Sequence, residues 1–361
     1  MIKYIFSFVL LIHGLIHMMG FVKAFGLGQI AQLTKVISKP VGAVWLATTM
    51  LFVVAMVLFL LKKESWPLLA IIAVALSQVL VFTTWQDAKF GTIANIIILI
   101  VALFGWTSQH FESQFRMDVN TNLNKSTIGT PDLLTEVDIQ TLPIPVQRYL
   151  RYAGVLNQPK VSNARITFEG EMRSKNGEWF RFNSVQYNFF NEPARLFFMK
   201  AQMYKIPVLG YHQFQDATAT MDIRLAGLVP VAKSSGPELN KAETVTYFND
   251  MCMFVPAALV DDRITWEPID TTSAKATFSH GDNTISAVLY FNEIGQLINF
   301  VSDDRYDVNS MKQYRFSTPL SDYKLINDRN TPGYGEGVWH YPDGEFVYGK
   351  FYLRDIEYNV S

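Results

Sequence analysis

The sequence predicts a membrane anchor of four transmembrane helices followed by a β-rich soluble domain. Two observations support this fold class. Four long apolar runs fill the first third of the 361-residue chain, and the rest is polar, aromatic-rich and alternating. With 49% hydrophobic and 17% charged residues, the chain is too apolar for one soluble globule and too polar for a polytopic transporter. A boundary near residue 108 explains both properties.

Each apolar run approaches the roughly 20 residues that a helix needs to cross about 30 Å of hydrocarbon. Isolated runs of this length can satisfy their backbone polar groups in lipid only as helices. Between the first two runs, Leu27, Ile30, Leu33 and Ile37 recur at helical spacing and predict a short amphipathic helix in the interface. The four predicted spans are residues 2–22, 41–61, 68–84 and 92–106.

The predicted domains are a four-helix transmembrane domain (1–108), a polar linker (109–135) and an antiparallel β domain (136–361). Residues 108–135 predict a linker because they are rich in Asn, Thr, Ser and Asp. Four spans place both chain ends on the same side of the bilayer. Lysine and arginine residues near the span ends are balanced between the two sides, so charge does not fix the orientation.

Polar side chains inside the spans form a candidate site in the membrane. His13 and His17 are four residues apart and share a helix face, while Gln78 and Asn95 lie in the third and fourth spans. Such groups can bond helices together, bind a small molecule such as a quinone-like ring, or ligate a metal or haem. The sequence leaves all three interpretations open, although no second histidine pair is present for haem ligation between helices.

Several function classes lack support. A net charge of −1 gives no electrostatic case for nucleic-acid binding, and a single cysteine, Cys252, allows neither an intramolecular disulfide nor a CxxC motif. No hydrolase elbow, P-loop, Rossmann fingerprint or zinc-protease motif is present. We therefore predict no cofactor and no metal. Five side chains could converge on a metal, but they lack the sequence spacing of known metal sites. They are His212, Glu243, Asp250, His280 and His340.

The soluble part predicts an antiparallel meander of about ten strands. A short helix is expected at 145–152, and period-two patterning begins near residue 164. Asn176-Gly177 between two apolar runs predicts a β-hairpin. After this hairpin, strands are expected at 195–203, 217–225, 263–268, 273–280, 284–291, 296–303, 313–318, 337–341 and 346–358.

One amphipathic helix interrupts the meander, at residues 238–253. Ser235-Gly236-Pro237-Glu238 has the pattern of a capping box, and apolar residues from Leu239 to Val255 follow on one stripe, with Cys252 among them. An antiparallel sheet needs one face covered. We therefore expect a curved antiparallel sheet, or incomplete barrel, around this helix.

The candidate ligand-binding residues are Asp303, Arg305, Asp250, Trp266 and His340. On a strand, Asp303 and Arg305 share a face, so they would form a buried ion pair, or Arg305 would hold a ligand carboxylate or phosphate. Asp250 would be a third member on the inserted helix. Aromatic and methionine side chains crowd the early strands on both faces, which predicts an apolar ligand cavity beside the ordinary core.

Four segments resemble an uncharacterised bacterial membrane-protein family over most of residues 140–360. The four-helix part is similar to DoxX-type units in its layout. The curved sheet around a helix is also similar to the lipoprotein-carrier fold of the bacterial envelope, whose concave face holds acyl chains. The segments are Pro145-Val146-Gln147-Arg148-Tyr149, Asn249-Asp250-Met251, Ser302-Asp303-Asp304-Arg305-Tyr306 and Gly333-Tyr334-Gly335-Glu336-Gly337.

The uncharacterised family has no established activity. The similarity to the carrier fold and the predicted apolar cavity favour a membrane-anchored binding or carrier module for a lipid-like or other apolar ligand. A membrane-bound enzyme of unknown reaction and a structural scaffold of the envelope are the alternatives. The expected partners are the lipid bilayer and a lipid-like ligand. The expected location is the bacterial inner membrane, with the soluble domain outside the cytoplasm, as a carrier would require.

Overall fold

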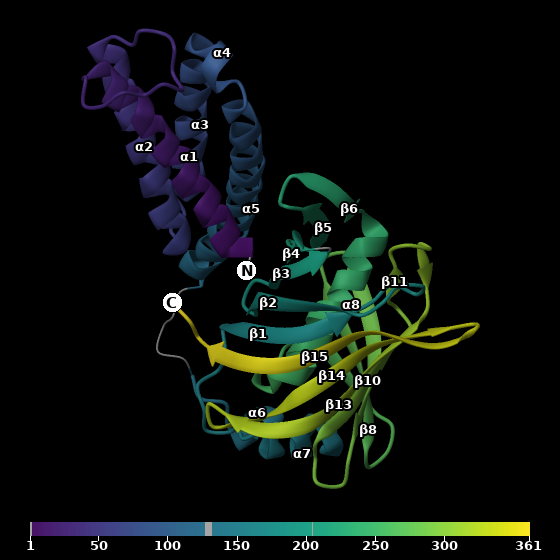
Figure 1. The fold of residues 1–361 in the computed structure, drawn as a ribbon. Coiled ribbons are helices and arrows are strands. Elements are labelled where there is room, and N and C mark those ends of the chain that lie inside the picture. Colours follow the sequence, from purple (N-terminus) through teal and green to yellow (C-terminus); the bar gives the residue numbers. More distant parts are fainter. Residues whose placement is uncertain (1, 127–131, 204) are drawn as a thin grey trace. The chain divides into compact units, whose positions relative to one another are not determined.

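The computed structural model describes residues 2–126, 132–203 and 205–361. The chain divides into two compact units (Figure 1). One is the helical unit, Met1–Phe111 with Ala226–Leu228. The other is the β domain, Glu112–Leu225 with Val229–Ser361.

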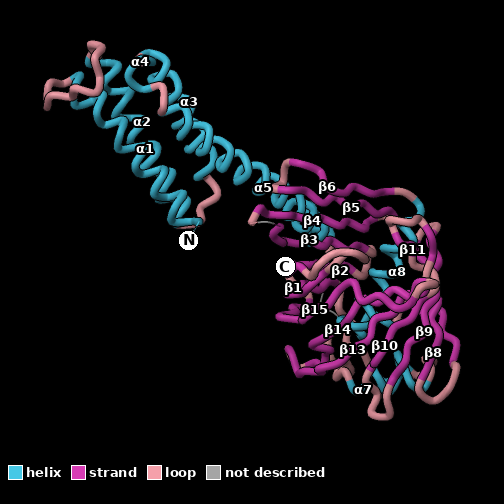
Figure 2. The backbone as a smooth tube through the Cα atoms, turned by 45° about the vertical axis from the view of Figure 1, so that its right-hand side comes forward, coloured by secondary structure: helices cyan, strands magenta, loops and turns pink. Residues whose placement is uncertain are grey.

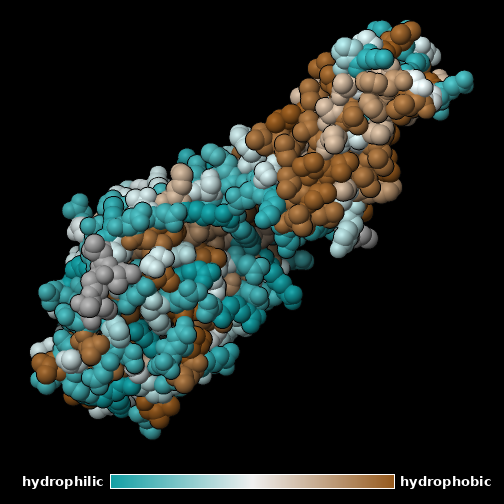
Figure 3. All heavy atoms as spheres, turned by 90° about the vertical axis from the view of Figure 1, so that its left-hand side faces the viewer, coloured by the Kyte–Doolittle hydropathy of each residue, from teal (hydrophilic) through white to brown (hydrophobic). Residues whose placement is uncertain are grey.

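The helical unit contains four helices that are long and apolar enough to cross a membrane. Outward-facing side chains such as Phe8, Val54 and Phe82 are exposed, and the visible face of the unit is predominantly hydrophobic (Figure 3). This is the surface expected of lipid-facing helices. The helices are α1 (Ile2–Ala24), α2 (Lys39–Leu60), α3 (Trp66–Thr83), the short α4 (Trp85–Ala88) and α5 (Gly91–Lys125).

The connection between α1 and α2 is irregular, so the expected amphipathic helix at 27–39 is wrong. Two of its apolar residues, Leu33 and Ile37, are instead buried against Trp45. The Asp87 carboxylate accepts a hydrogen bond from the Thr34 backbone N–H at 2.7 Å. The apolar spacing therefore reflects packing of an irregular loop.

Helix α5 corrects the expected linker, because it continues for 19 residues beyond Trp106. Its polar residues are compatible with a helix, and Phe115 and Val119, four residues apart, are buried on one face. The Phe115 ring packs against Phe198 and Tyr211 of the sheet, with centroids 5.2 and 5.6 Å apart. Residues 127–131 of the expected linker lie outside the described residues.

The β domain is one antiparallel sheet of thirteen strands in the order β6-β5-β4-β3-β2-β1-β15-β14-β13-β10-β9-β8-β7. The edges β6 and β7 do not pair with each other, so the curved sheet is not closed into a barrel, which confirms the expected fold class. The bounds are β1 (Asn163–Met172), β2 (Phe180–Phe189), β3 (Ala194–Met203), β4 (Ile206–Gln215), β5 (Thr218–Leu225), β6 (Val229–Ser235), β7 (Ile264–Pro268), β8 (Ser273–His280), β9 (Asn283–Phe291), β10 (Leu297–Ser302), β13 (Arg315–Ile326), β14 (Arg329–Tyr341) and β15 (Gly344–Tyr358).

Short elements complete the domain. Helix α7 confirms the helix expected at 145–152. A small two-stranded sheet, β11 with β12, follows β10. Their bounds are α6 (Glu136–Ile139), α7 (Ile144–Tyr152), a 3₁₀ helix (Pro256–Leu259), β11 (Tyr306–Asp307) and β12 (Lys312–Gln313).

Helix α8 (Pro237–Phe254) follows edge strand β6 and leads to the opposite edge, β7. Figure 2 shows the strands curving around it. The expected helix at 238–253 is therefore confirmed, and Cys252 is buried in its core face. The capping box is wrong: no side chain caps the helix, and the N-cap is Gly236 at φ +113°, a conformation that favours glycine.

Two strands, β4 and β6, are not indicated by alternation. In β4, the four consecutive residues from Val208 to Tyr211 are buried. Tyr211 packs under α5, where its hydroxyl donates to Asp118 at 2.7 Å, while Val208 belongs to a core cluster with Met199. Both faces of this strand are covered, and a strand covered on both faces loses the period of two.

Candidate ligand-binding site

A cavity of about 370 Å³ lies between α8 and the concave side of the sheet. Its volume is within the range of about 300–1,000 Å³ typical of small-molecule sites. Most of the lining is aromatic or aliphatic, and methionines are prominent, as the crowding of the early strands predicts. The apolar lining includes Phe168, Met172, Phe180, Phe197, Met199, Met221, Ile223, Leu239, Met253, Phe254, Phe316, Trp339, Tyr348 and Phe351.

A buried charged cluster forms one part of the cavity wall. Arg195 on β3 is 7% exposed, and its Nε donates to Asp250 Oδ2 at 2.6 Å. Its Nη1 donates to Glu243 Oε2 at 3.2 Å and its Nη2 to Gln186 Oε1 at 3.0 Å. His212 Nδ1 lies 3.5 Å from Glu243 Oε1. Each nitrogen of the Arg195 guanidinium therefore has a protein partner.

Helix geometry explains the cluster. Glu243 and Asp250 are seven residues apart on α8, so they share a face two turns apart. Arg195 lies opposite these two carboxylates on β3, the strand that follows β2, which carries Gln186. Burial of these charges is tolerated because they pair and are hydrogen-bonded.

The two carboxyl groups have opposite pKa shifts. Burial raises the pKa of Glu243, but the hydrogen bond from His212 and the charge of Arg195 outweigh it and hold the pKa at about 2. Burial raises the pKa of Asp250, and the charge of Arg195 offsets only part of that shift. The site thus keeps Glu243 ionised and makes Asp250 the easier group to protonate.

We expect the stabilising effect of ionised Glu243 to be present above its usual pKa of 4.5 and to be lost as the pH falls toward 2. The difference in unfolding free energy between wild type and Glu243→Gln should shrink by about 3 kcal/mol across this range. Hydrogen–deuterium exchange of the β-domain strands in the full chain measures it. The raised pKa of Asp250 acts with the opposite sign and is present in both proteins.

The matched control for this variant is Glu169→Gln, at an exposed carboxylate 2.6 Å from Arg354. The unfolding free energy of Glu169→Gln should stay within about 1 kcal/mol of that of the wild type across the same pH range. A Glu243→Gln difference that stays constant with pH would contradict the role given to Glu243.

Arg305 and Asp250 line the cavity, as expected. They do not join Asp303, so the expected Asp303–Arg305 pair is wrong. Strand β10 ends at Ser302, and the alternation that put both side chains on one face does not continue beyond it. Asp303 instead forms an ion pair with Arg315 at 2.9 Å, and the side chains are 68% and 57% exposed.

Trp266 and His340 lie apart from this lining. Trp266 is on edge strand β7, packed against the main core. His340 is on β14, where its Nε2 is 2.8 Å from Ser317 Oγ and its Nδ1 is 3.3 Å from Glu345. Neither lines the cavity that contains Arg305, so the structure does not bring them together with Arg305 and Asp250.

Arg195, Gln186 and the role of Glu243 were not predicted from the sequence. One signal was available: acidic residues at positions i and i+7 on the helix stripe predict a buried cation opposite. Arg195 gives a weaker signal, as a charge at the start of the apolar run Leu196 to Met199.

The intramembrane candidates come together in the helical unit. His13 Nε2 is 2.8 Å from Asn95 Oδ1, which also accepts from Ser77 Oγ at 2.9 Å. Asn95 Nδ2 donates to Gln78 Oε1 at 3.0 Å. His17 Nδ1 donates to the His13 carbonyl at 2.8 Å. These bonds connect α1, α3 and α5, the arrangement expected of helix-to-helix hydrogen bonding.

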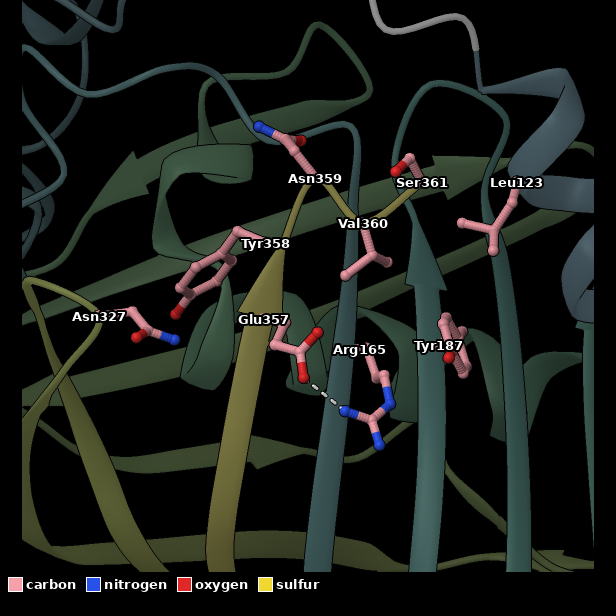
Figure 4. Close-up of a pocket in the computed structure, with 9 residues that line it drawn as sticks. All are labelled: Leu123, Arg165, Tyr187, Asn327, Glu357, Tyr358, Asn359, Val360 and Ser361. Atoms are coloured by element: carbon pink, nitrogen blue, oxygen red, sulfur yellow. Dashed lines mark hydrogen bonds and ion pairs between the residues drawn. The ribbon is translucent and has the colours of Figure 1, made fainter.

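Two wider hollows of the β domain open to solvent. One, of about 680 Å³, lies near the C-terminus (Figure 4). There, Arg165 on β1 points toward Glu357 on β15 and pairs with it at 2.5 Å, beside Tyr187. The other, of about 590 Å³, is bordered by α5 and contains Lys200, which pairs with Glu112. Their charges are paired, and neither is lined mainly by apolar side chains.

Among the described residues, no group of three or more His, Cys, Asp or Glu side chains is arranged to hold a metal ion. Glu243 and His212 do approach each other, but Arg195 occupies the other carboxylate oxygen. His280 lies elsewhere, against Phe214.

A family of unknown function (DUF6544) matches residues 132–351, which is more than half of the chain. The chain belongs to this family. The match spans most of the β domain and leaves out α1 to α5.

Among solved structures, a crystal structure of a LolA superfamily protein from Nitrosomonas europaea is similar at 10% identity with a TM-score of 0.32. The match covers 59% of this chain and 92% of that chain. A search of curated proteins found no significant match.

Proposed function

We propose that this member of the family is a membrane-anchored binding or carrier module for a lipid-like, apolar ligand. The observation that carries the proposal is the cavity of about 370 Å³ between α8 and the sheet, with its aromatic and methionine lining. Flexible, polarizable methionines suit irregular apolar ligands. A mainly apolar and aromatic lining that also contains polar groups, here Arg195, Glu243 and Asp250 among others, is the usual form of a small-molecule site.

The four apolar helices provide a membrane anchor for this module. We place the protein in the bacterial inner membrane with the β domain outside the cytoplasm, where a carrier of envelope lipids would act. We also propose that the helical unit is similar to DoxX-type units. Only the layout of its helices supports this similarity.

A membrane-bound enzyme is the second candidate, because titratable groups with shifted pKa values converge in the same cavity. Against it, the donors of Arg195 and the oxygens of Glu243 are engaged with one another. The cluster therefore satisfies itself, as a structural network does. A pure scaffold would have a filled core in place of the cavity.

Filling the cavity should abolish ligand retention. Ile223 on β5 lines the cavity, so Ile223→Trp should remove the lipid-like mass adduct that native mass spectrometry detects on full-length protein released from lipid nanodiscs. The matched control is Ile298→Trp, at an exposed position of β10 outside the lining, which should keep the adduct. A wild-type chain without an adduct, or one retained by Ile223→Trp, would contradict the proposal.

A further inference from the structure

Arg305 is held in the cavity by aromatic rings. Its guanidinium lies over Phe316, Trp339 and Tyr348, at 4.0, 5.1 and 5.8 Å from the ring centroids. Nη1 donates to the Tyr348 hydroxyl at 3.3 Å. Its Nε is buried and has no hydrogen-bond partner among the described residues. A buried donor without an acceptor costs free energy unless a ligand supplies the acceptor.

Among the described residues, no carboxylate forms an ion pair with Arg305. Within the described ranges, no carboxylate oxygen lies within 4.0 Å of its guanidinium nitrogens. The nearby acids are engaged elsewhere: Asp303 pairs with Arg315, Asp304 pairs with Lys241 at 3.1 Å, and Glu243 binds Arg195 and His212. Arg195 and Arg305 line the same cavity, but Arg195 pairs directly with two carboxylates, whereas Glu243 acts on Arg305 only through its charge, without contact.

The size of the cavity limits the apolar part of a ligand. A cavity of about 150 Å³ holds one benzene ring. At the same density, the 370 Å³ here hold roughly fifteen non-hydrogen atoms. That is enough for one alkyl chain of moderate length and too little for two acyl chains.

We propose that Arg305 binds the anionic head of a single-chain amphiphile whose alkyl chain occupies the cavity between α8 and the sheet. This inference rests on the proposed function and names its ligand class. The planar guanidinium can bind a carboxylate or a phosphate through two parallel hydrogen bonds, with Nε as one donor. The rings that stack on it fix its orientation, and the Tyr348 hydroxyl lies beside the same head group.

Competition for a neutral photoreactive probe tests the ligand class. The full chain in lipid nanodiscs is cross-linked with a diazirine-bearing dodecanol, in the presence of dodecanoate, dodecyl phosphate, dodecanol or dodecylamine. Dodecanoate or dodecyl phosphate should displace the probe at a concentration at least about tenfold below dodecanol, as a charge-assisted hydrogen-bonded pair provides. Dodecylamine should be the weakest competitor. Comparing the first two separates a carboxylate head from a phosphate head.

Variants locate the head group. Arg305→Met should still cross-link the neutral probe but lose the preference for anionic competitors, and Arg305→Lys should keep part of it. The control Arg315→Met, at an exposed arginine outside the lining, should keep the full preference. Arg173 also lines the cavity, but its Nε donates to the Val347 carbonyl at 2.9 Å, so Arg173→Met should keep the preference too.

The outcomes separate the two proposals. Absence of cross-linking to cavity residues in wild type would overturn the proposed function and this inference together. Cross-linking in the cavity with equal competition by dodecanoate, dodecyl phosphate and dodecanol would keep the proposed function and overturn the anionic head. A preference that follows Arg173→Met instead of Arg305→Met would overturn the assignment to Arg305. The wild-type competition series decides the ligand class even if a variant fails to fold.

Discussion

Replacing Arg195 with Met should lower the free energy of unfolding of the β domain by about 3–5 kcal/mol. The substitution removes the cation that lies between Asp250 and Glu243, at 2.6 and 3.2 Å. It leaves Asp250 buried without a counter-ion and Glu243 with only His212 beside it. It also leaves Gln186 Oε1 without its donor. Hydrogen–deuterium exchange of the β strands in the full chain measures the loss.

Two comparisons make this expectation specific. Arg315→Met removes an arginine from an exposed pair with Asp303 and should cost no more than about 1 kcal/mol. Replacing Arg195, Glu243 and Asp250 together by apolar residues should recover much of the loss, because no uncompensated charge remains. If Arg195→Met costs as little as Arg315→Met, the cluster does not have the structural role given to it.

Phe248→Ala should destabilise the β domain by a similar amount, about 3–5 kcal/mol. Phe248 on α8 is fully buried and stacks on Phe278 of β8, with centroids 5.3 Å apart and an interplanar angle of 6°. It also meets the Phe300 ring of β10 edge-on at 6.0 Å. The substitution leaves a void where the helix joins the sheet, so the loss of packing adds to the loss of apolar burial.

The same exchange measurement checks Phe248→Ala, with urea unfolding as a second readout. Tyr290→Ala removes an aromatic ring at a 42% exposed position of β9 and is the matched control. It should cost less than about 1.5 kcal/mol, since the residue is already exposed to water and leaves no buried void when truncated. Equal losses for the two variants would mean that α8 is not anchored through Phe248.

The architecture could be predicted wherever the sequence carries a local signal. The four spans are long apolar runs, α8 has a stripe of apolar residues, and Asn176-Gly177 marks a hairpin turn. Strand β4 carries no such signal, because core side chains cover one of its faces and α5 covers the other. The helical continuation of α5 to Lys125 was hidden for the same kind of reason: its few buried residues, such as Phe115, gain their partners from strands far along the chain.

The site was harder to predict than the fold. Arg305 and Asp250 both line the cavity, but the predicted pairing of Arg305 with Asp303 assumed that β10 extends beyond Ser302. Beyond the end of the strand, Asp303 is exposed and pairs with Arg315. The alternation of side chains along a strand cannot indicate that partner. Arg195 reaches Asp250 from 55 residues away, and such a contact is set by the register of the sheet against α8.

The difference between Arg195 and Arg305 in the cavity wall is the basis of the functional account. Arg195 has its hydrogen-bond donors and its charge satisfied by the protein, so it stabilises the wall. Arg305 keeps a buried donor without an acceptor and a charge without a carboxylate among the described residues, so it is available to a ligand. Arg195 thus has a structural role in the cavity wall, and Arg305 is the cation that we propose for the ligand.

The most direct test of this account is a density map of the full chain in lipid nanodiscs prepared with dodecanoate. We expect one elongated density between α8 and the concave face of the sheet, with its head at the Arg305 guanidinium and its chain among the apolar side chains that include Met199 and Met253. A map in which side chains close the cavity and no density lies beside Arg305 would contradict the account.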